Sequence, residues 1–244
     1  MKELFCGSLV MTWVAASMFQ LPVSQPDDLM DGFDYLKPEN QDTIMRQLER
    51  DDPWVTIIAW PCGPWCSWAR FQLGRGGIGA ENVKEKRTMA QGLLDFSAKV
   101  ARHRLERNRL VLMENPWVSD AWENEALEDV LLDPEMDFVR GGMCCWNKRD
   151  RVTGLHYLKP TGFAVNRGAL AQRLACRCCG GHNHERIQGT NEYGDRSQQA
   201  GGYTPELAIE VILGACEDLL GRYDEQQAFP AEVDDLQAVG RRGD

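Results

Sequence analysis

Two short apolar runs each end in residues that could take part in covalent chemistry. The run 54–60 leads into Pro61-Cys62, and the run 109–113 leads into Glu114-Asn115. Both runs are β-branched or aliphatic and are bounded by turn residues, which is typical of buried parallel strands. The carboxyl ends of such strands share the crevice in which open α/β sheets bind ligands. A thiol nucleophile and a proton-handling carboxyl group are therefore expected in one crevice, a pairing suited to covalent catalysis.

Each motif also has an ordinary structural explanation. A Pro-Cys pair at a strand end is often a small buried hydrophobic site, and a Glu-Asn-Pro sequence is often a turn. Cys66 is a competing thiol shortly after Cys62. The presence of both motifs, in order and each after a predicted strand, favours the catalytic interpretation.

The start of the chain predicts a third strand with a turn suited to cofactor binding. The pattern over residues 3–9 predicts a short strand that ends in a turn of small residues, Gly7-Ser8. A helix over 11–19 follows. Small residues let the backbone approach a ligand closely, and a helix N-terminus offers free N–H groups. Many such turns contain glycine for packing alone, which is the alternative.

Alternating strand and helix patterns over the rest of the chain predict an α/β protein with a doubly wound, mostly parallel, Rossmann-like sheet. The expected helices cover 43–49, 81–107, 121–132, 168–174 and 205–220, and further strands are expected at 138–146 and 163–165. We expect an α/β core over 1–140, a small irregular Cys/His-rich insertion over 141–200, a helix over 201–222 that completes the core, and a disordered acidic tail over 223–244.

Composition restricts the environment of this chain of 244 residues. No apolar run approaches the length of a membrane span, and the N-terminus has no basic stretch before its apolar segment, so neither a membrane anchor nor a signal peptide is expected. Nine cysteines without a secretion signal indicate free thiols or metal ligands in a reducing intracellular compartment, which would be the nucleus in a eukaryote. The oligomeric state is not predicted.

Charge is unevenly distributed along the chain. The whole chain carries −10, whereas the stretch 140–190 has nine Lys and Arg against two Asp and Glu, a net charge of +7. Such a stretch could form a face that contacts phosphates. A solvated surface on an otherwise acidic protein explains it equally well.

The densest group of metal-ligand residues lies in that basic stretch. Its members fall within nine positions: Cys176, Cys178, Cys179, His182 and His184. Thiolate and imidazole are zinc ligands, but this spacing matches no standard finger, because ligands so close together need a distant partner to complete a tetrahedron. Cys144-Cys145 could supply more ligands. The alternative is a thiol-rich loop with a DNA-contacting histidine.

In order along the chain, Phe5-Cys6-Gly7-Ser8, Pro61-Cys62, Glu114-Asn115 and Gly202-Tyr203-Thr204-Pro205 resemble the motifs of S-adenosylmethionine-dependent DNA cytosine-5 methyltransferases. The resemblance covers roughly residues 1–220. Glu-Asn-Pro and the downstream Lys159-Pro160-Thr161 are similar to a diverged branch found in mobile elements and phage-like proteins.

This resemblance implies methyl transfer from S-adenosylmethionine to C5 of a cytosine extruded from DNA. Cys62, directly after Pro61 like the family's nucleophile, would attack C6. Glu114 would hold N3 and the exocyclic amine, and Asn115 would fix the turn. Arg149 and Arg151 would assist at cytosine O2.

The resemblance also implies a cofactor site at the start of the chain. Phe5 would pack on the cofactor, and Gly7 and Ser8 would offer backbone to its carboxylate end. The remaining candidates are Asp28 and Asp34 for the ribose hydroxyls and adenine amine, with Pro61 and Tyr203 beside the cofactor. Solvated loop acids and ordinary helix capping are the alternatives for the two aspartates and for the Tyr203 motif.

Two departures from the family pattern leave other functions open. Trp60 stands where the family usually has Pro, and Asn147–Arg151 is the nearest match to its Gln-x-Arg-x-Arg strand. The alternatives are an RNA cytosine-5 methyltransferase, a catalytically degenerate fold that binds nucleic acid and contains zinc, and a non-catalytic domain of a mobile-element polyprotein.

Overall fold

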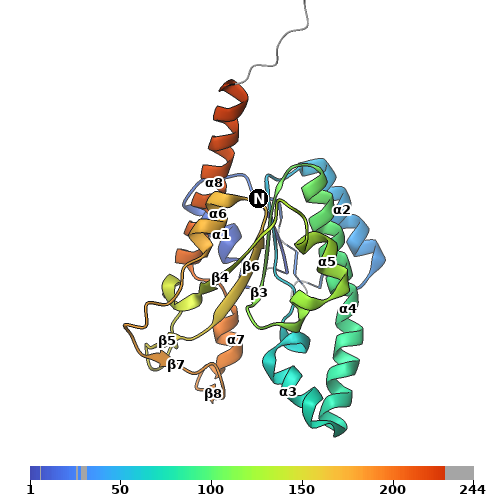
Figure 1. Ribbon diagram of the computed structural model, residues 1–244, viewed down its shortest axis with the longest axis vertical. Coiled ribbons are helices and arrows are strands. Elements are labelled where there is room, and N and C mark those ends of the chain that lie inside the picture. Colours follow the sequence, from blue (N-terminus) through green and yellow to red (C-terminus); the bar gives the residue numbers. More distant parts are fainter. Residues whose placement is uncertain (6, 26, 29–31, 229–244) are drawn as a thin grey trace, which may run out of the picture.

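The computed structural model describes residues 1–5, 7–25, 27–28 and 32–228. At its centre is a five-stranded sheet with the order β1-β2-β3-β6-β4 (Figure 1). Strands β1 (Lys2–Leu4), β2 (Val55–Ile58) and β3 (Leu110–Pro116) are parallel. Strand β6 (Pro160–Val165) runs antiparallel between β3 and β4 (Asp137–Gly142). The prediction of an α/β chain with a mostly parallel sheet is confirmed.

Helices cover both faces of this sheet (Figure 1). One face packs against α2 (Pro38–Asp51), α4 (Gly77–Glu106) and α5 (Glu125–Leu131). The other packs against α1 (Val10–Ser17), α6 (Gly168–Leu174) and α8 (Pro205–Ala228).

Side chains of the central strands alternate between the two apolar clusters. In β3, Val111 and Met113 join the α2–α4–α5 side, whereas Leu110 and Leu112 join the α1–α6–α8 side. All four are buried. Burial on both faces explains why the sequence shows a continuous apolar run here rather than an alternating one.

The connections at the carboxyl edge of the sheet carry short elements. After β2 come the 3-10 turn η2 (Gly63–Trp65) and α3 (Ser67–Arg75), which forms a hairpin with α4. The turns η3 (Asp120–Glu123) and η4 (Met143–Trp146) follow β3 and β4. An irregular lobe contains β5 (His156–Tyr157), β7 (His184–Glu185), β8 (Thr190–Asn191), β9 (Gly194–Asp195) and α7 (Arg196–Gly201).

Three sequence predictions about boundaries are corrected. The range 141–200 is not a separate insertion, because β6 lies inside the central sheet and α6 packs on α8. Helix α2 covers Pro38–Asp51 and is therefore longer at both ends than the helix predicted over 43–49. Helix α8 continues through Ala228, so the predicted disordered tail over 223–244 is wrong up to that residue, because Glu and Gln have a high helix propensity. Residues 229–244 lie outside the described part.

Among the described residues, no helix combines the length and apolar character needed to cross a lipid bilayer.

Candidate active site

Cys62 and Glu114 reach the same edge of the sheet. Ile58 of β2 pairs with Met113 of β3, so the residues that follow each strand leave the sheet side by side. Glu114 is buried and Cys62 is half-buried at the start of η2. The Asn115 side-chain amide donates a hydrogen bond to the backbone oxygen of Trp60, at 2.9 Å. Asn115 therefore joins the end of β3 directly to the segment that carries the thiol, and Glu-Asn-Pro is part of the strand rather than the turn that was expected.

A lysine that the site prediction did not include completes this group. Because β6 runs antiparallel to β3, Thr161 pairs with Pro116 and the start of β6 lies beside the end of β3. Lys159 therefore places its Nζ 3.8 Å from Oε1 of Glu114, and both side chains are only 10% exposed. The hydroxyl of Tyr203 donates to Oε2 of Glu114 at 3.2 Å. The Lys-Pro-Thr motif held the sequence signal for Lys159, but local pattern does not reveal an antiparallel register.

The charges of this group act on the Cys62 thiol. Burial raises the pKa of Cys62 above its usual value, and the positive charge of Lys159 opposes that rise. Glu114 and Cys66 add to the rise. The carboxylate and the ammonium group are therefore close enough to influence the protonation of the Cys62 thiol. The Cys66 sulfur bonds instead to the backbone oxygen of Gly63, at 3.2 Å.

The turn between β1 and α1 is tightly wound. Phe5, Gly7 and Leu9 all have positive φ angles, of 58°, 45° and 55°. The backbone N–H of Gly7 donates to Oδ2 of Asp28 at 2.9 Å, so Asp28 lies beside this turn. The Phe5 ring packs on Tyr35, with 4.1 Å between centroids. Cys6 lies outside the described residues.

The same turn meets the final sequence motif. A Cβ built on Gly202 would lie 3.6 Å from Cβ of Ser8 and 3.6 Å from Nζ of Lys148. Burial, reinforced by the nearby charges of Lys159 and Arg151, lowers the pKa of Lys148 to about 8. The structure thus brings Ser8, Gly202 and Lys148 together, with Lys148 beside Lys159.

Other predicted site residues are placed elsewhere. Oδ1 of Asp34 accepts a hydrogen bond from the N–H of Leu36, a turn-forming role just before α2. Pro61 is exposed. Arg149 is exposed, and its guanidinium donates to Oδ1 of Asn147 and the backbone oxygen of Gly154 within its own loop.

Arg151 is exposed and lies over the ring of Tyr193, 5.8 Å from its centroid. The cations that the structure places next to Glu114 and Ser8 are Lys159 and Lys148, neither of which was among the predicted site residues.

A separate group of potential metal ligands lies in the irregular lobe. One ligand atom from each of Cys144, Cys178, His182 and His184 lies within 4.8 Å of the others. This set corrects the predicted one, because Cys176 and Cys179 are exposed and stand outside the group. Cys144, from η4, is the distant partner that the spacing required.

The basic stretch 140–190 contains some charges that are paired or buried within the fold and others that are exposed to solvent. Arg167 and Arg173 are paired with acidic residues of the fold, and Lys159 is buried beside Glu114. The arginines that remain exposed are Arg140, Arg149, Arg151, Arg177 and Arg186. The positive surface is therefore smaller than the sequence count indicates.

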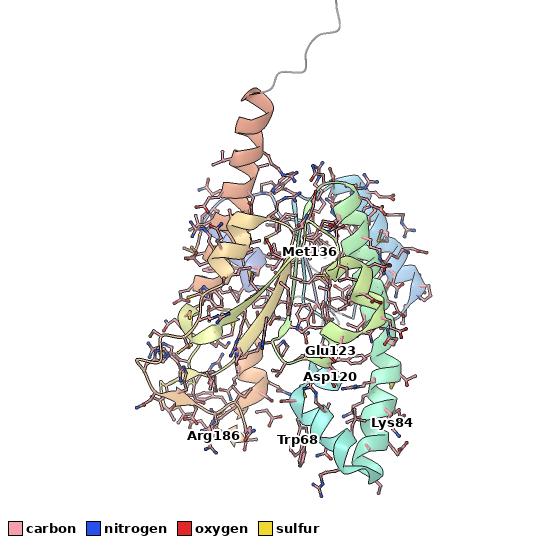
Figure 2. All side chains as sticks on the ribbon, in the orientation of Figure 1. Trp68, Lys84, Asp120, Glu123, Met136 and Arg186 are labelled. Carbon is pink, nitrogen blue, oxygen red and sulfur yellow. The ribbon has the colours of Figure 1, made fainter. Side chains whose placement is uncertain are left out.

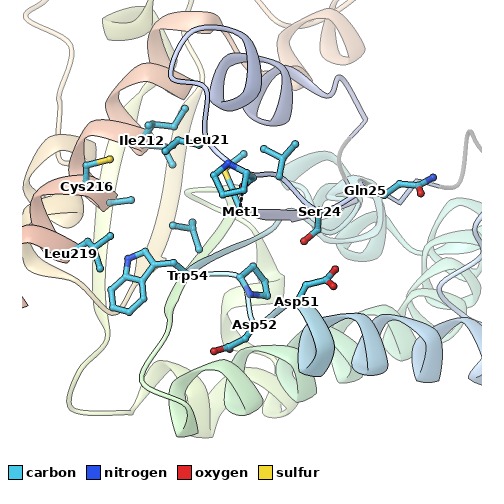
Figure 3. Close-up of a pocket in the computed structure, with 16 residues that line it drawn as sticks. Met1, Leu21, Ser24, Gln25, Asp51, Asp52, Trp54, Ile212, Cys216 and Leu219 are labelled. Carbon is cyan, nitrogen blue, oxygen red and sulfur yellow. Dashed lines mark hydrogen bonds between the residues drawn. The ribbon is translucent and has the colours of Figure 1, made fainter.

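A cavity of about 750 Å³ opens at the opposite, amino-terminal edge of the sheet (Figure 3). It is lined mainly by apolar side chains, including Met1, Trp54, Ile212 and Leu219. None of the predicted catalytic or cofactor residues lines it.

No protein-family model matches the chain, and no curated protein or solved structure matches it either.

Proposed function

We propose that this protein transfers a methyl group from S-adenosylmethionine to C5 of cytosine in DNA through a covalent adduct at Cys62. The observation that supports the proposal is the convergence of Cys62, Glu114 and Lys159 at the carboxyl edge of the sheet. Ligands of open α/β sheets bind at this edge, and the group combines a nucleophile, an acid and a cation.

The reaction needs a thiolate because C5 of cytosine is too weak a nucleophile to accept a methyl group unaided. The Cys62 sulfur forms a bond to C6, and the resulting enamine carbon C5 attacks the methyl carbon of the sulfonium. The bond from methyl to sulfonium sulfur breaks, and S-adenosylhomocysteine leaves. Loss of the C5 proton to a base then expels the thiolate and restores the ring.

Glu114 and Lys159 would couple activation of the thiol to substrate binding. The negative charge of Glu114 raises the pKa of Cys62, and the positive charge of Lys159 lowers it. When the cytosine binds, its exocyclic amine donates a hydrogen bond to the Glu114 carboxylate, which offsets part of the negative charge of that carboxylate. Lys159 then dominates the field at the sulfur, so the thiolate forms in the presence of the base that it attacks.

The cofactor would occupy the region where the β1–α1 turn meets Gly202, as in a Rossmann-like sheet. Gly7 and Ser8 present backbone there, and Asp28 is already bonded to Gly7. Tyr203, through its bond to Glu114, would connect cofactor binding with binding of the target base.

DNA would approach the same end of the molecule. In Figure 2, Trp68 on α3 and Arg186 in the irregular lobe lie at the end of the fold that carries the carboxyl edge. Trp68 and Phe71 are 64% and 52% exposed and stack on each other at 5.4 Å, which suits contact with unstacked bases. The exposed arginines of the lobe supply charge for phosphates.

A second candidate function is a methyltransferase fold that binds nucleic acid without catalysis. Burial of the Cys62 thiol favours it, because the raised pKa keeps that thiol protonated at neutral pH unless a substrate changes the balance.

Duplex DNA containing 5-fluorocytosine tests the proposal, because fluorine at C5 blocks the final elimination and traps the adduct. With S-adenosylmethionine, the wild-type chain and Cys66→Ala should form a denaturation-resistant adduct, and Cys62→Ala should not. Peptide mapping should place the base on Cys62. An adduct with RNA alone would indicate the RNA enzyme. Binding without any adduct would indicate the non-catalytic module and contradict the proposal.

A further inference from the structure

We propose that Cys144, Cys178, His182 and His184 bind one Zn²⁺ ion, which holds the irregular lobe to the end of β4. The proposal is independent of methyl transfer, because it concerns residues outside the group around Cys62.

The separations between the ligand atoms fit a tetrahedral site. The Cys178 sulfur lies 3.8 Å from Nε2 of His182 and 3.4 Å from Nε2 of His184. Zinc bonds of about 2.3 Å to sulfur and 2.0–2.1 Å to nitrogen place sulfur and nitrogen about 3.5 Å apart in a tetrahedron. Closing the group on an ion therefore requires shifts of only a few tenths of an ångström at these two contacts.

The donor set selects the metal class. Two thiolates and two imidazoles suit Zn²⁺, whereas Mg²⁺ and Ca²⁺ take oxygen ligands. Four protein ligands leave no open position, which is the arrangement of a structural rather than a catalytic zinc site.

The surrounding backbone is arranged around the sulfur atoms. The N–H of Gly180, a residue with φ of 73°, points to the Cys178 sulfur at 3.3 Å. A Cβ built on Gly142 would lie 3.4 Å from the Cys144 sulfur and 3.5 Å from the backbone nitrogen of Cys178. The glycine at position 142 thus allows the two cysteine segments to approach closely, and a backbone N–H bond to sulfur is the kind of contact that orients a metal-bound thiolate.

The irregular lobe needs a cross-link of this kind, because this segment has no hydrophobic core of its own. From Ala175 through Gln199, a range that the structure describes completely, no residue is buried. Its strands are two residues long, and such short pairings are not stable alone. A segment without its own core is normally held by metal or disulfide bonds.

The site also connects to the candidate active site. His184 pairs with His156 and Glu185 pairs with Tyr157 in the parallel β5–β7 contact. The backbone N–H of Tyr157 bonds to the oxygen of Lys148, and the N–H of Lys159 bonds to the oxygen of Tyr157. An ion at His184 would therefore steady the strand that lies between the two active-site lysines.

Metal analysis of the purified full chain is the first test. The wild-type protein and the matched variants Cys176→Ser and Cys179→Ser should contain about one zinc per chain, and Cys144→Ser should contain almost none. Zinc retained by Cys144→Ser but lost in Cys179→Ser would overturn the ligand set. Absence of metal with a Cys144–Cys178 disulfide in peptide mapping would overturn the site altogether.

Two further readouts cover the case in which Cys144→Ser does not fold. Metal-free wild-type protein titrated with Co²⁺ should show the visible absorption of a tetrahedral ion with two thiolate ligands. Chelation should also increase trypsin cleavage severalfold after Arg177 and Arg186, which are exposed within the lobe, and added zinc should reverse it. An octahedral cobalt spectrum, or cleavage that chelation does not change, would contradict the proposal.

Discussion

Lys159 Nζ lies 3.8 Å from Oε1 of Glu114, and both side chains are largely withdrawn from water. The two residues arrive from antiparallel neighbours, β6 and β3, and meet where the Cys62 segment begins. Breaking one partner of a buried ion pair leaves the other uncompensated, so substitutions here report on the electrostatics of the thiol as well as on stability.

Removing the charge of Lys159 and removing the charge of Glu114 should change the reactivity of the Cys62 thiol in opposite directions. Lys159→Gln removes the charge that lowers the pKa of Cys62, so alkylation of Cys62 by iodoacetamide should need a higher pH than in the wild type. Glu114→Gln removes a charge that raises this pKa, so alkylation should begin at a lower pH. The rate at Cys62 is followed by peptide mass spectrometry. Coincident profiles for the three proteins would show that the groups are not coupled.

Lys148 should make DNA binding pH-dependent near pH 8. Its lowered pKa of about 8 means that it is charged below this pH and neutral above it. Phosphate binding favours the charged form, so affinity for duplex DNA should fall between pH 7 and pH 9. Lys148→Gln should remove this change and reduce the slope of log affinity against log salt by about 0.9. Affinity is measured by fluorescence anisotropy, with Lys84→Gln, a change at an exposed residue of α4, as the matched control.

Glu3 should destabilise the protein as pH rises. Burial raises the pKa of this β1 carboxyl to about 7, although Thr12 donates to it through both its N–H and its hydroxyl. A raised folded-state pKa gives stability that is complete below the unfolded value of 4.5 and is lost as pH passes 7. Glu3→Gln should therefore gain on the order of 3 kcal/mol over the wild type between pH 4.5 and pH 9.

Urea unfolding of both proteins at these two pH values checks the Glu3 expectation, because the difference between them cancels the titration of other groups. A difference that does not change with pH would contradict it.

Asp52 should matter far more to stability than its neighbour Asp51. Asp52 accepts from Arg109 and Arg104, which hold its pKa near 2, and the Arg104 side chain is fully buried. Asp52→Asn would leave Arg104 without its counter-charge. Because Asp52 is itself 35% exposed, water screens the pair and the cost should be about 2 kcal/mol rather than the 3–5 of a fully buried pair.

The matched control is Asp51→Asn, whose Arg50 partner is solvent-exposed and which should unfold like the wild type in urea. The stabilising effect of Asp52 lies above its ordinary pKa of 3.8, so the two variants should converge as pH falls toward 2. Equal stability of the two variants at pH 7 would contradict the assignment.

The local sequence pattern is sufficient to predict strands and helices that are apolar or are bounded by clear turn residues. The strand before Cys62 and the helix Gly168–Leu174 occur where the sequence predicts them, and the strand predicted over 109–113 occurs as β3, which continues to Pro116. Their signals are short apolar runs between turn residues, and these do not depend on distant neighbours.

The features that escaped prediction depend on contacts between distant parts of the chain. Lys159 reaches Glu114 only because β6 is antiparallel, and Cys144 joins His184 only because β4 ends beside the lobe. Periodicity carries no information about strand direction or about which loops meet. Arg149 lies in the nearest candidate for a basic family motif, but in the structure its guanidinium donates to the backbone oxygen of Gly154 in its own loop.

The position of β6 also has a consequence for how the chain folds. Strand β4 is made first, yet its only strand neighbour in the described sheet is β6, which is also its link to β3. Until residues 160–165 leave the ribosome, β3 and β4 both expose unpaired backbone edges, which are prone to wrong associations. The sheet can therefore be completed only late in synthesis, and Lys159 can approach Glu114 only at that stage.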